Sequence, residues 1–191
     1  MSNLTPEKYN LINSIEDNIT YSNDEFLKNK LIDRIIKFKE AGYDINDFII
    51  DDDICKNDNM KEGWPPLGYW FIYILGYNKY NKLDILNILV EHGANINFVD
   101  ENNNTMLHGC VISLNYKLLK DLLDTKIDIN IKNKDGYDAL ELCKYIQNNY
   151  KTMTGNMDYQ KNILDSGIMT EKELTDILEN IESILKKNES E

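Results

Sequence analysis

The residue types that could carry out catalysis are few in this chain. It has two histidines, His92 and His108, and three cysteines, Cys55, Cys110 and Cys143. A catalytic nucleophile needs a base within hydrogen-bond reach, and no Ser-His-Asp or Cys-His set is visible in the local sequence. The cysteines form no CxxC pair and their number is odd, which argues against a disulfide framework and a zinc site. We therefore expect no catalytic residue and no enzyme.

Alternating acidic and amide residues suggest one metal-binding pattern. Asp100, Asn102 and Asn104 are spaced like the start of an EF-hand loop, but that loop needs a glycine and a closing glutamate where this chain has Thr105 and Val111. Glycine-rich phosphate-binding loops of the GxxxxGK or GxGxxG type are also absent from the sequence. We expect neither a metal nor a cofactor.

The charge balance bears on the class of partner. The 191 residues include 33 acidic and 21 basic residues, for a net charge of -12, and Arg34 is the only arginine. Such a chain repels nucleic acid and anionic membranes, so any electrostatically guided partner should be a basic protein. The alternative is that the acidity only keeps the protein soluble. The sequence has no run of eighteen apolar residues and no signal-peptide core at its start. We expect an intracellular protein that is a monomer without its partner.

Two stretches of the sequence repeat with an offset of 33 residues. The segment 91–97 returns at 124–130, and the segment 103–110 returns at 136–143. Cys110 and Cys143 therefore occupy the same repeat position. A period of this length is typical of stacked helical repeats.

On these segments the chain resembles the ankyrin repeat family. Gly93-Ala94-Asn95-Ile96-Asn97 is similar to the loop after the second helix of a repeat. Thr105-Met106-Leu107-His108 is similar to the Thr-Pro-Leu-His opening of the first helix, with Met106 in place of proline. In the next copy Lys126 replaces the loop glycine, and only Leu140 of the opening signature remains.

The resemblance implies an all-α fold, a short ankyrin-like helical repeat solenoid with helical caps. It also implies that His108 satisfies backbone groups within the loop and that Cys110 and Cys143 are packed in the core. Gly42 lies 51 residues before Gly93, which is one period plus eighteen. We predict a single domain over 1–191, made of an N-terminal cap repeat (1–46), a repeat with insertions opened by Pro65-Pro66-Leu67-Gly68 (47–97), a regular repeat (98–130), and a last repeat with C-terminal cap helices (131–191).

Apolar spacing predicts the helices themselves. Short amphipathic helices are expected over 82–91 and 116–124, and helices this short need neighbours to bury their faces. At the C-terminus, Thr170 and Glu173 form a predicted capping box, whereas 151–166 is polar and predicted to be mostly loop. A longer helix is expected near each end of the chain. The stripe of the N-terminal one is Phe26, Leu27, Leu31, Ile35 and Phe38, and that of the C-terminal one is Leu174, Ile177, Leu178, Ile181 and Leu185.

The inserted part of the second repeat is acidic first and aromatic afterwards. Seven of the nineteen aromatic residues lie between Trp64 and Tyr80. Aromatic side chains bordered by charge are typical of binding hot spots, although Trp70, Phe71 and Tyr73 could equally form the core face of a lengthened helix. The candidate binding residues here are Asp51, Asp52, Asp53, Trp64, Tyr69, Trp70 and Tyr77.

In proteins of this resemblance, partners usually contact the finger-like loops and the inner helices. Transferred by position, that implicates two sets of residues. The regular repeat (98–130) contributes Glu101, Asn102, Asn104, Ile112 and Ser113. The last repeat (131–191) contributes Lys134, Asp135, Tyr137 and Tyr145.

The prediction is a non-catalytic protein-binding module with an acidic concave surface and an aromatic insertion. Its sharpest form is a stoichiometric inhibitor or immunity-type protein that blocks a basic partner such as a toxin or nuclease. An adaptor or host-directed effector that recruits a partner is the alternative. A hydrolase would require His108 to lie in a pocket beside a nucleophile.

Overall fold

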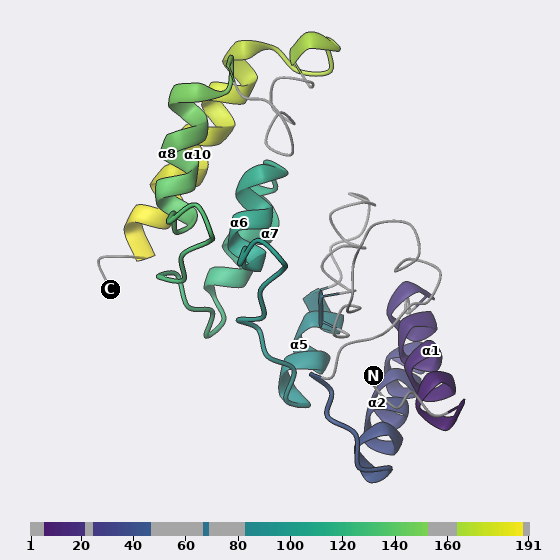
Figure 1. Ribbon diagram of the computed structural model, residues 1–191. Helices are drawn as coiled ribbons and strands as arrows, with labels where there is room; N and C mark the ends of the chain where they lie inside the picture. The colour runs from purple at the N-terminus through teal and green to yellow at the C-terminus, as the bar shows by residue number, and fades with distance from the viewer. Residues whose placement is uncertain (1–5, 22–24, 47–66, 69–82, 153–163, 189–191) are drawn as a thin grey trace. The chain divides into compact units, whose positions relative to one another are not determined.

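The computed structural model describes residues 6–21, 25–46, 67–68, 83–152 and 164–188, and all regular secondary structure in these ranges is helical. The chain divides into two compact units, Met1–Ile96 and Asn97–Glu191. Figure 1 shows the helices of each unit. The all-α architecture predicted from the sequence is confirmed for the described residues. None of the described helices is long and apolar enough to cross a membrane.

The first unit starts with two paired helices, α1 (Pro6–Tyr21) and α2 (Glu25–Glu40). Helix α1 begins at a proline, which is well suited to a first turn because its missing N–H has no partner there in any helix. Apolar residues at helical spacing form the core between the two helices. They are Ile12, Ile15, Ile19, Leu31, Ile35 and Phe38.

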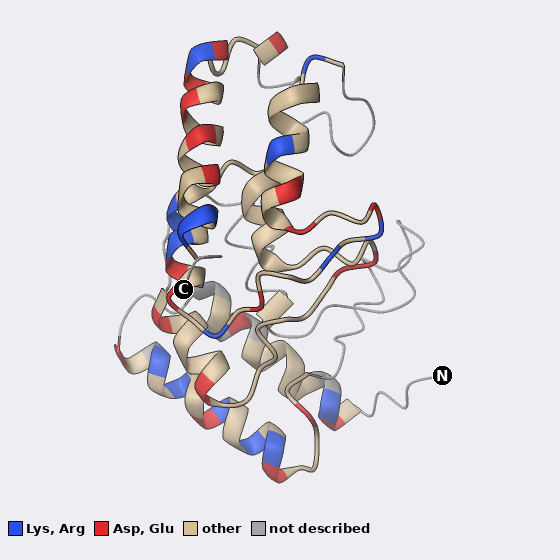
Figure 2. Ribbon diagram, turned by 90° about the vertical axis from the view of Figure 1, so that its left-hand side faces the viewer, with Lys and Arg blue, Asp and Glu red and all other residues tan. Residues whose placement is uncertain are grey.

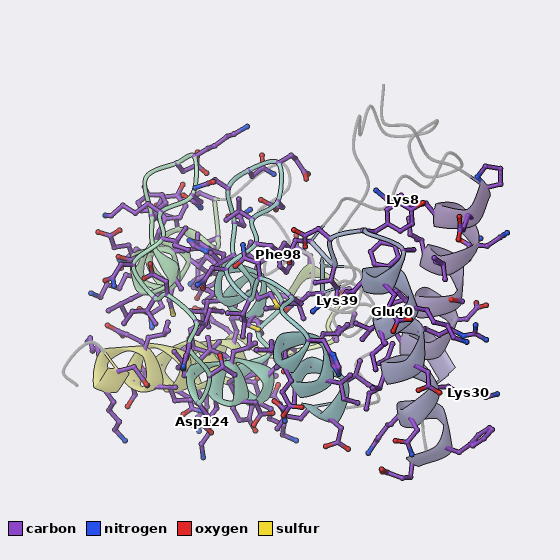
Figure 3. All side chains as sticks on the ribbon, turned by 90° about the horizontal axis from the view of Figure 1, so that it is seen from below. Lys8, Lys30, Lys39, Glu40, Phe98 and Asp124 are labelled. Carbon is purple, nitrogen blue, oxygen red and sulfur yellow. The ribbon has the colours of Figure 1, made fainter. Side chains whose placement is uncertain are left out.

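Phe26 is a correction to the predicted apolar stripe of α2. Its side chain is 65% exposed, and the Nζ atom of Lys30 lies 4.5 Å from the centre of its ring. Five residues separate Phe26 from Leu31, and at 100° per residue this spacing turns Phe26 well away from the buried face. Figure 3 shows Lys30 on the outer side of the same helix.

Helix α5 (Leu83–Glu91) confirms the predicted helix over 82–91, residue 82 lying outside the described ranges. Polar contacts join it to α2. Lys28 forms an ion pair with Asp84, and the Nζ atom of Lys39 donates to the carbonyl of His92 at 3.1 Å. Lys39 is labelled in Figure 3. These contacts place residues 25–46 beside 83–95, as expected for consecutive repeats.

Helices α2 and α5 end in the same way, with a glycine in the loop that follows each of them. Gly42 has a φ of 85° and Gly93 a φ of 95°, the left-handed conformation that closes a helix with the fewest steric penalties for glycine. At the third equivalent position Lys126 has no positive φ, and the hydroxyl of Thr125 donates instead to the carbonyl of Leu122 at 2.5 Å. A side-chain hydrogen bond therefore replaces the glycine-dependent closure in that repeat.

The second unit holds four labelled helices. They are α6 (Met106–Ile112), α7 (Tyr116–Leu123), α8 (Ala139–Asn149) and α10 (Glu171–Asn188). Helix α6 packs against α7 and α8, and α10 packs against α8 and α7. The first helix of one repeat, α6, thus lies beside the first helix of the next, α8. The second helices, α7 and α10, also lie side by side, which is the arrangement of stacked helical repeats. Figure 1 shows α8 and α10 side by side.

The core of the second unit follows the predicted periodicity. On α10, Leu174, Leu178, Ile181 and Leu185 are buried, while Ile177 is half-buried. Thr170 and Glu173 form the predicted capping box, because the Thr170 N–H donates to a carboxylate oxygen of Glu173 at 2.8 Å and the Glu173 N–H donates to the Thr170 hydroxyl at 3.2 Å. Helix α8 has a capping box too, formed by Asp138 and Glu141.

The segment between α8 and α10 is held at both of its ends. The Tyr150 hydroxyl donates to a carboxylate oxygen of Glu171 at 2.8 Å, and Lys151 forms an ion pair with the same carboxylate at 2.5 Å. Both partners lower the pKa of Glu171, the lysine more strongly. Most of the loop predicted over 151–166 lies outside the described residues.

Candidate protein-binding surface

The first finger loop, residues 97–105, is organised by the carboxylate of Asp100. One of its oxygens accepts hydrogen bonds from the backbone N–H groups of Asn102 at 2.9 Å and Asn104 at 2.6 Å. The other accepts from the Asn104 side-chain amide at 3.1 Å. Asn103 adopts a left-handed φ of 61°, which asparagine tolerates better than most residues. The alternating pattern that suggested a cation loop is therefore a turn held by its own acid.

The second finger loop, residues 130–138, repeats this design 33 residues later. Asn133 stands at the Asp100 position, and its side-chain oxygen accepts from the N–H groups of Asp135 at 3.1 Å and Tyr137 at 3.0 Å. Its own N–H donates to the Tyr137 carbonyl at 2.8 Å. Gly136 adopts a left-handed φ of 85° at the position where Asn103 has 61° in the first finger. Asn133 is buried, so these bonds are shielded from water.

The two fingers are bonded to one another in three places. The Lys134 N–H donates to the Asn102 carbonyl at 2.9 Å. The Asn103 side-chain amide donates to the Lys132 carbonyl at 2.5 Å, and the Asn133 amide donates to the Asn104 side-chain oxygen at 3.1 Å. The backbone polar groups of two loops that contain no helix or strand are thus satisfied by side chains and by each other.

His108 joins the fingers to the helix layer. Its Nδ1 accepts from the Thr105 N–H at 3.1 Å, so the ring carries its proton on Nε2, which donates to the Tyr137 carbonyl at 2.9 Å. The side chain is 1% exposed, and burial lowers the pKa of the imidazole. The backbone-satisfying role that the resemblance implied is confirmed. The hydrolase alternative required this histidine beside a nucleophile, whereas both of its ring nitrogens are occupied by the loops.

The exposed tips of the fingers carry four of the predicted binding residues. Glu101, Asn102, Lys134 and Asp135 are exposed. Asn104 is half-buried, and its amide and carbonyl groups bond to the Asp100 side chain and to the Asn133 side chain. Asn104 therefore positions the fingers.

The remaining predicted residues of these two repeats, Ile112, Ser113, Tyr137 and Tyr145, are all half-buried. The rings of Tyr137 and Tyr145 are stacked, with centroids 5.2 Å apart and planes at 26°, and both side chains are half-buried. Ile112 is half-buried on α6, and the Ser113 hydroxyl donates to the Gly109 carbonyl at 2.8 Å. The structure thus brings Tyr145 of α8 against the second finger, which sequence spacing alone does not show.

The bridging side chains of the first finger have no counterparts in the second. Asn103 and Asn104 correspond to Gly136 and Tyr137, and neither of these has an amide to reach a further loop. His108 corresponds to Glu141, which forms an ion pair with Lys132 at 2.7 Å within the same repeat. That lysine lowers the pKa of Glu141. The second finger therefore ends the ladder of side-chain bonds and displays an aromatic pair.

Other predicted residues fall into two groups. Cys110 and Cys143 are buried as the resemblance implied, and burial raises the pKa of both thiols, that of Cys143 to about 12.

In the ranges that the structure describes, no group of three or more acidic, histidine or cysteine side chains could hold a metal ion. The candidates in the inserted segment lie outside the described residues. They are Asp51, Asp52, Asp53, Trp64, Tyr69, Trp70 and Tyr77.

Comparison with known proteins gives the same assignment. The family model described as "Ankyrin repeats (many copies)" matches residues 72–123. The matched residues are similar to ankyrin repeats. A fowlpox virus (strain NVSL) protein whose name describes it as an ankyrin repeat protein is 27% identical over 127 residues, which cover 66% of this chain. The chain spans 20% of the length of that relative.

A solved structure was also matched, the ankyrin repeat domain of Bcl-3, described as a unique member of the IkappaB protein family. The similarity has a TM-score of 0.40 and 18% identity, and covers 80% of this chain and 50% of that one. Ankyrin repeats in general are protein–protein interaction modules and are typically non-catalytic.

Sequence reasoning missed Asp100 and Asn133 as the organisers of the two loops. The signal was available, because these residues are 33 apart and the turns they hold have left-handed residues, Asn103 and Gly136, that are also 33 apart. Reading each finger as an Asx turn would have identified both.

The neutral state of His108 predicts a specific pH dependence. Because the pKa of His108 is lower in the folded protein than the ordinary value of 6.5, the unfolded chain takes up the proton first as the pH falls. Its contribution to the free energy of unfolding should be complete above about pH 6.5 and should be lost below it. Urea unfolding between about pH 7.5 and 5.5 should show this decline.

His108→Gln should remove that decline, because glutamine can serve the same capping box but does not titrate. His92→Gln is the matched control, since these are the chain's two histidines, and it should retain the wild-type decline. The same slope in wild type and His108→Gln would contradict the assignment.

The role of Asn133 predicts a graded pair of substitutions. Asn133→Ala removes three side-chain hydrogen bonds, two accepted from backbone N–H groups and one donated to Asn104. At about 1 kcal/mol for each lost bond, it should cost about 3 kcal/mol of unfolding free energy. Asn133→Asp keeps the acceptor oxygen and loses only the bond to Asn104, so its cost should be smaller. Urea denaturation at pH 7.5 measures both, and equal costs would show that the turn does not depend on this oxygen.

Proposed function

We propose that this chain binds a protein partner through its finger surface, defined here as the exposed side chains of Glu101, Asn102, Lys134 and Asp135 together with Tyr137 and Tyr145. The observation that carries the proposal is the internal bonding of the two fingers. The hydrogen bonds within and between the fingers are all present in the chain without a partner. Binding to a preorganised loop costs less ordering entropy than binding to a loop that must fold on the partner.

The aromatic pair is the proposed centre of this surface. Stacked tyrosines offer large contact areas with few rotatable bonds and a hydroxyl for hydrogen bonding, and tyrosine is enriched among residues that dominate binding energy. The charged fingertips around the pair then supply a polar rim that favours the right partner over wrong ones.

Charge supports a basic partner. The chain has a net charge of -12, which attracts a basic protein at long range. The fingertips themselves are mixed in charge, because they carry the basic Lys134 as well as the acidic Glu101 and Asp135, and both charge colours appear on the loops in Figure 2. Steering by the whole chain and local recognition by the fingers are therefore separate contributions.

In its sharpest form, the proposal is a stoichiometric inhibitor that covers the working surface of a basic protein such as a toxin or nuclease. The acidic run at 51–53 and the aromatic residues Trp64, Tyr69, Trp70 and Tyr77 stay candidate binding residues of the same partner. An adaptor that recruits its partner is the alternative. A one-to-one complex that abolishes the partner's activity would favour the inhibitor, and a partner that stays active in a larger assembly would favour the adaptor.

The finger surface is tested by affinity capture with the full chain and substitution of its aromatic pair. Tyr145→Ala should weaken capture of the main partner at least about tenfold, as expected when a hot-spot side chain worth more than 1.4 kcal/mol is lost. Tyr43→Ala is the control, because Tyr43 is also a half-buried tyrosine but follows α2, outside the finger loops. Circular dichroism should show both variants folded. Equal losses in the two variants would argue against the finger surface.

Electrostatic steering is tested by the salt dependence of association. Between about 0.05 and 0.5 M salt, the association rate with the captured partner should fall by about tenfold or more, while the dissociation rate changes less. Stopped-flow fluorescence or surface plasmon resonance measures both rates. An association rate independent of salt would mean that the acidity serves solubility alone.

A further inference from the structure

The second unit has a groove of about 370 Å³ on helices that carry no finger. It lies between α7 and the C-terminal half of α10. Its apolar lining comes from Tyr116, Leu123 and Ile184, all of them half-buried. A volume at the lower end of the range for binding pockets suits one or two anchoring side chains of a short segment rather than a whole helix.

The charged lining of the groove is mostly basic, although the chain has a net charge of -12. Lys120 of α7 and Lys187 of α10 are both exposed, and neither forms an ion pair with another residue that the structure describes. By contrast, the neighbouring Lys186 is paired with Glu182 at 2.6 Å. Figure 2 shows the lysines gathered at the C-terminal end of α10, below the acidic residues of the same helix.

One acid borders the groove, Asp124 at the end of α7. It is exposed and is labelled in Figure 3. The C-terminus of a helix also carries a partial negative charge, so this end of the groove disfavours an anion. The groove is therefore polarised, with Lys120 on α7 and Lys187 in the last turn of α10 as its cations, and with Asp124 at the end of α7 as its acid.

From this arrangement we infer that the groove binds an acidic protein segment with a large apolar side chain between carboxylates. The apolar side chain packs against Tyr116, Leu123 and Ile184. The carboxylates pair with Lys120 and Lys187. Because the whole chain is acidic, only a segment that meets these two lysines directly gains from its negative charge, and that makes the site selective.

This inference is independent of the finger surface, because the groove belongs to α7 and α10 whereas the fingers precede α6 and α8. If both surfaces are occupied, the chain joins a basic partner to an acidic one. That outcome would favour the adaptor over the simple inhibitor.

The test uses the full chain and three synthetic probe peptides of equal length. The first has leucines flanked by glutamates, the second has each glutamate replaced by lysine, and the third has each leucine replaced by serine. In heteronuclear NMR titrations at low salt, only the first should bind, with the largest shifts at the amides of residues 116–124 and 180–188. Tighter binding of the lysine peptide, shifts elsewhere in the chain or no binding of the first peptide would overturn the inference.

Charge substitutions give the second arm of the test. The double variant Lys120→Glu/Lys187→Glu should weaken binding of the glutamate peptide by about tenfold or more, whereas Asp124→Asn should strengthen it. Lys144→Glu/Lys172→Glu changes the net charge equally at two exposed lysines outside the groove, and it should have a much smaller effect.

Equal weakening by the two double variants would show non-specific attraction and would overturn the site. Tyr145→Ala should leave peptide binding unchanged, which separates this result from failure of the finger surface.

Discussion

Two side chains, Asp100 and Asn133, satisfy the backbone of loops that have no helix or strand to do so. A finger loop exposes a turn of peptide groups, and each group that loses water must find another partner. Asp100 and Asn133 each take part in five hydrogen bonds, three through the side chain and two through the backbone. Without them, the fingertips would have no defined direction, and the surface proposed for binding would not exist before the partner arrives.

The helices depend on the same repetition. Helix α6 has seven residues and α7 has eight, lengths that are unstable alone in water. They persist because each buries an apolar face against an equivalent helix of the next repeat. His108 connects this helix layer to the finger layer, since its ring bonds Thr105 on one side and the Tyr137 carbonyl on the other. Loop and helix order are thus coupled through one neutral imidazole.

The last repeat (131–191) differs from the regular repeat before it (98–130) in a way that suits a position at the end of a stack. Asn103, Asn104 and His108 each reach into the following repeat, whereas Gly136, Tyr137 and Glu141 do not. In place of side chains that bond to a following repeat, the last repeat has the Tyr137–Tyr145 pair and the ion pair between Lys132 and Glu141. The same substitution that ends the side-chain ladder also supplies the apolar surface on which binding is proposed to centre.

The sequence predicted best those features that depend on residues close together in the chain. The 33-residue period, the helices over 116–123 and 171–188, the burial of Cys110 and Cys143 and the Thr170–Glu173 capping box all follow from residues close together in the chain or from exact repetition. Asp138 and Glu141 form a capping box although their repeat keeps only one residue of the family signature, because the cap depends on two side chains three positions apart.

The sequence by itself therefore determined that this is an all-α repeat protein with little visible catalytic chemistry and a strongly acidic charge. The tertiary structure decided which residues face outward. Asn104 turns inward although it lies in a polar loop. Tyr145 meets Tyr137, and α7 and α10 enclose a groove between lysines. The physical reason is that each of these outcomes depends on the direction of a side chain relative to an element distant in the chain, and local spacing does not contain that direction.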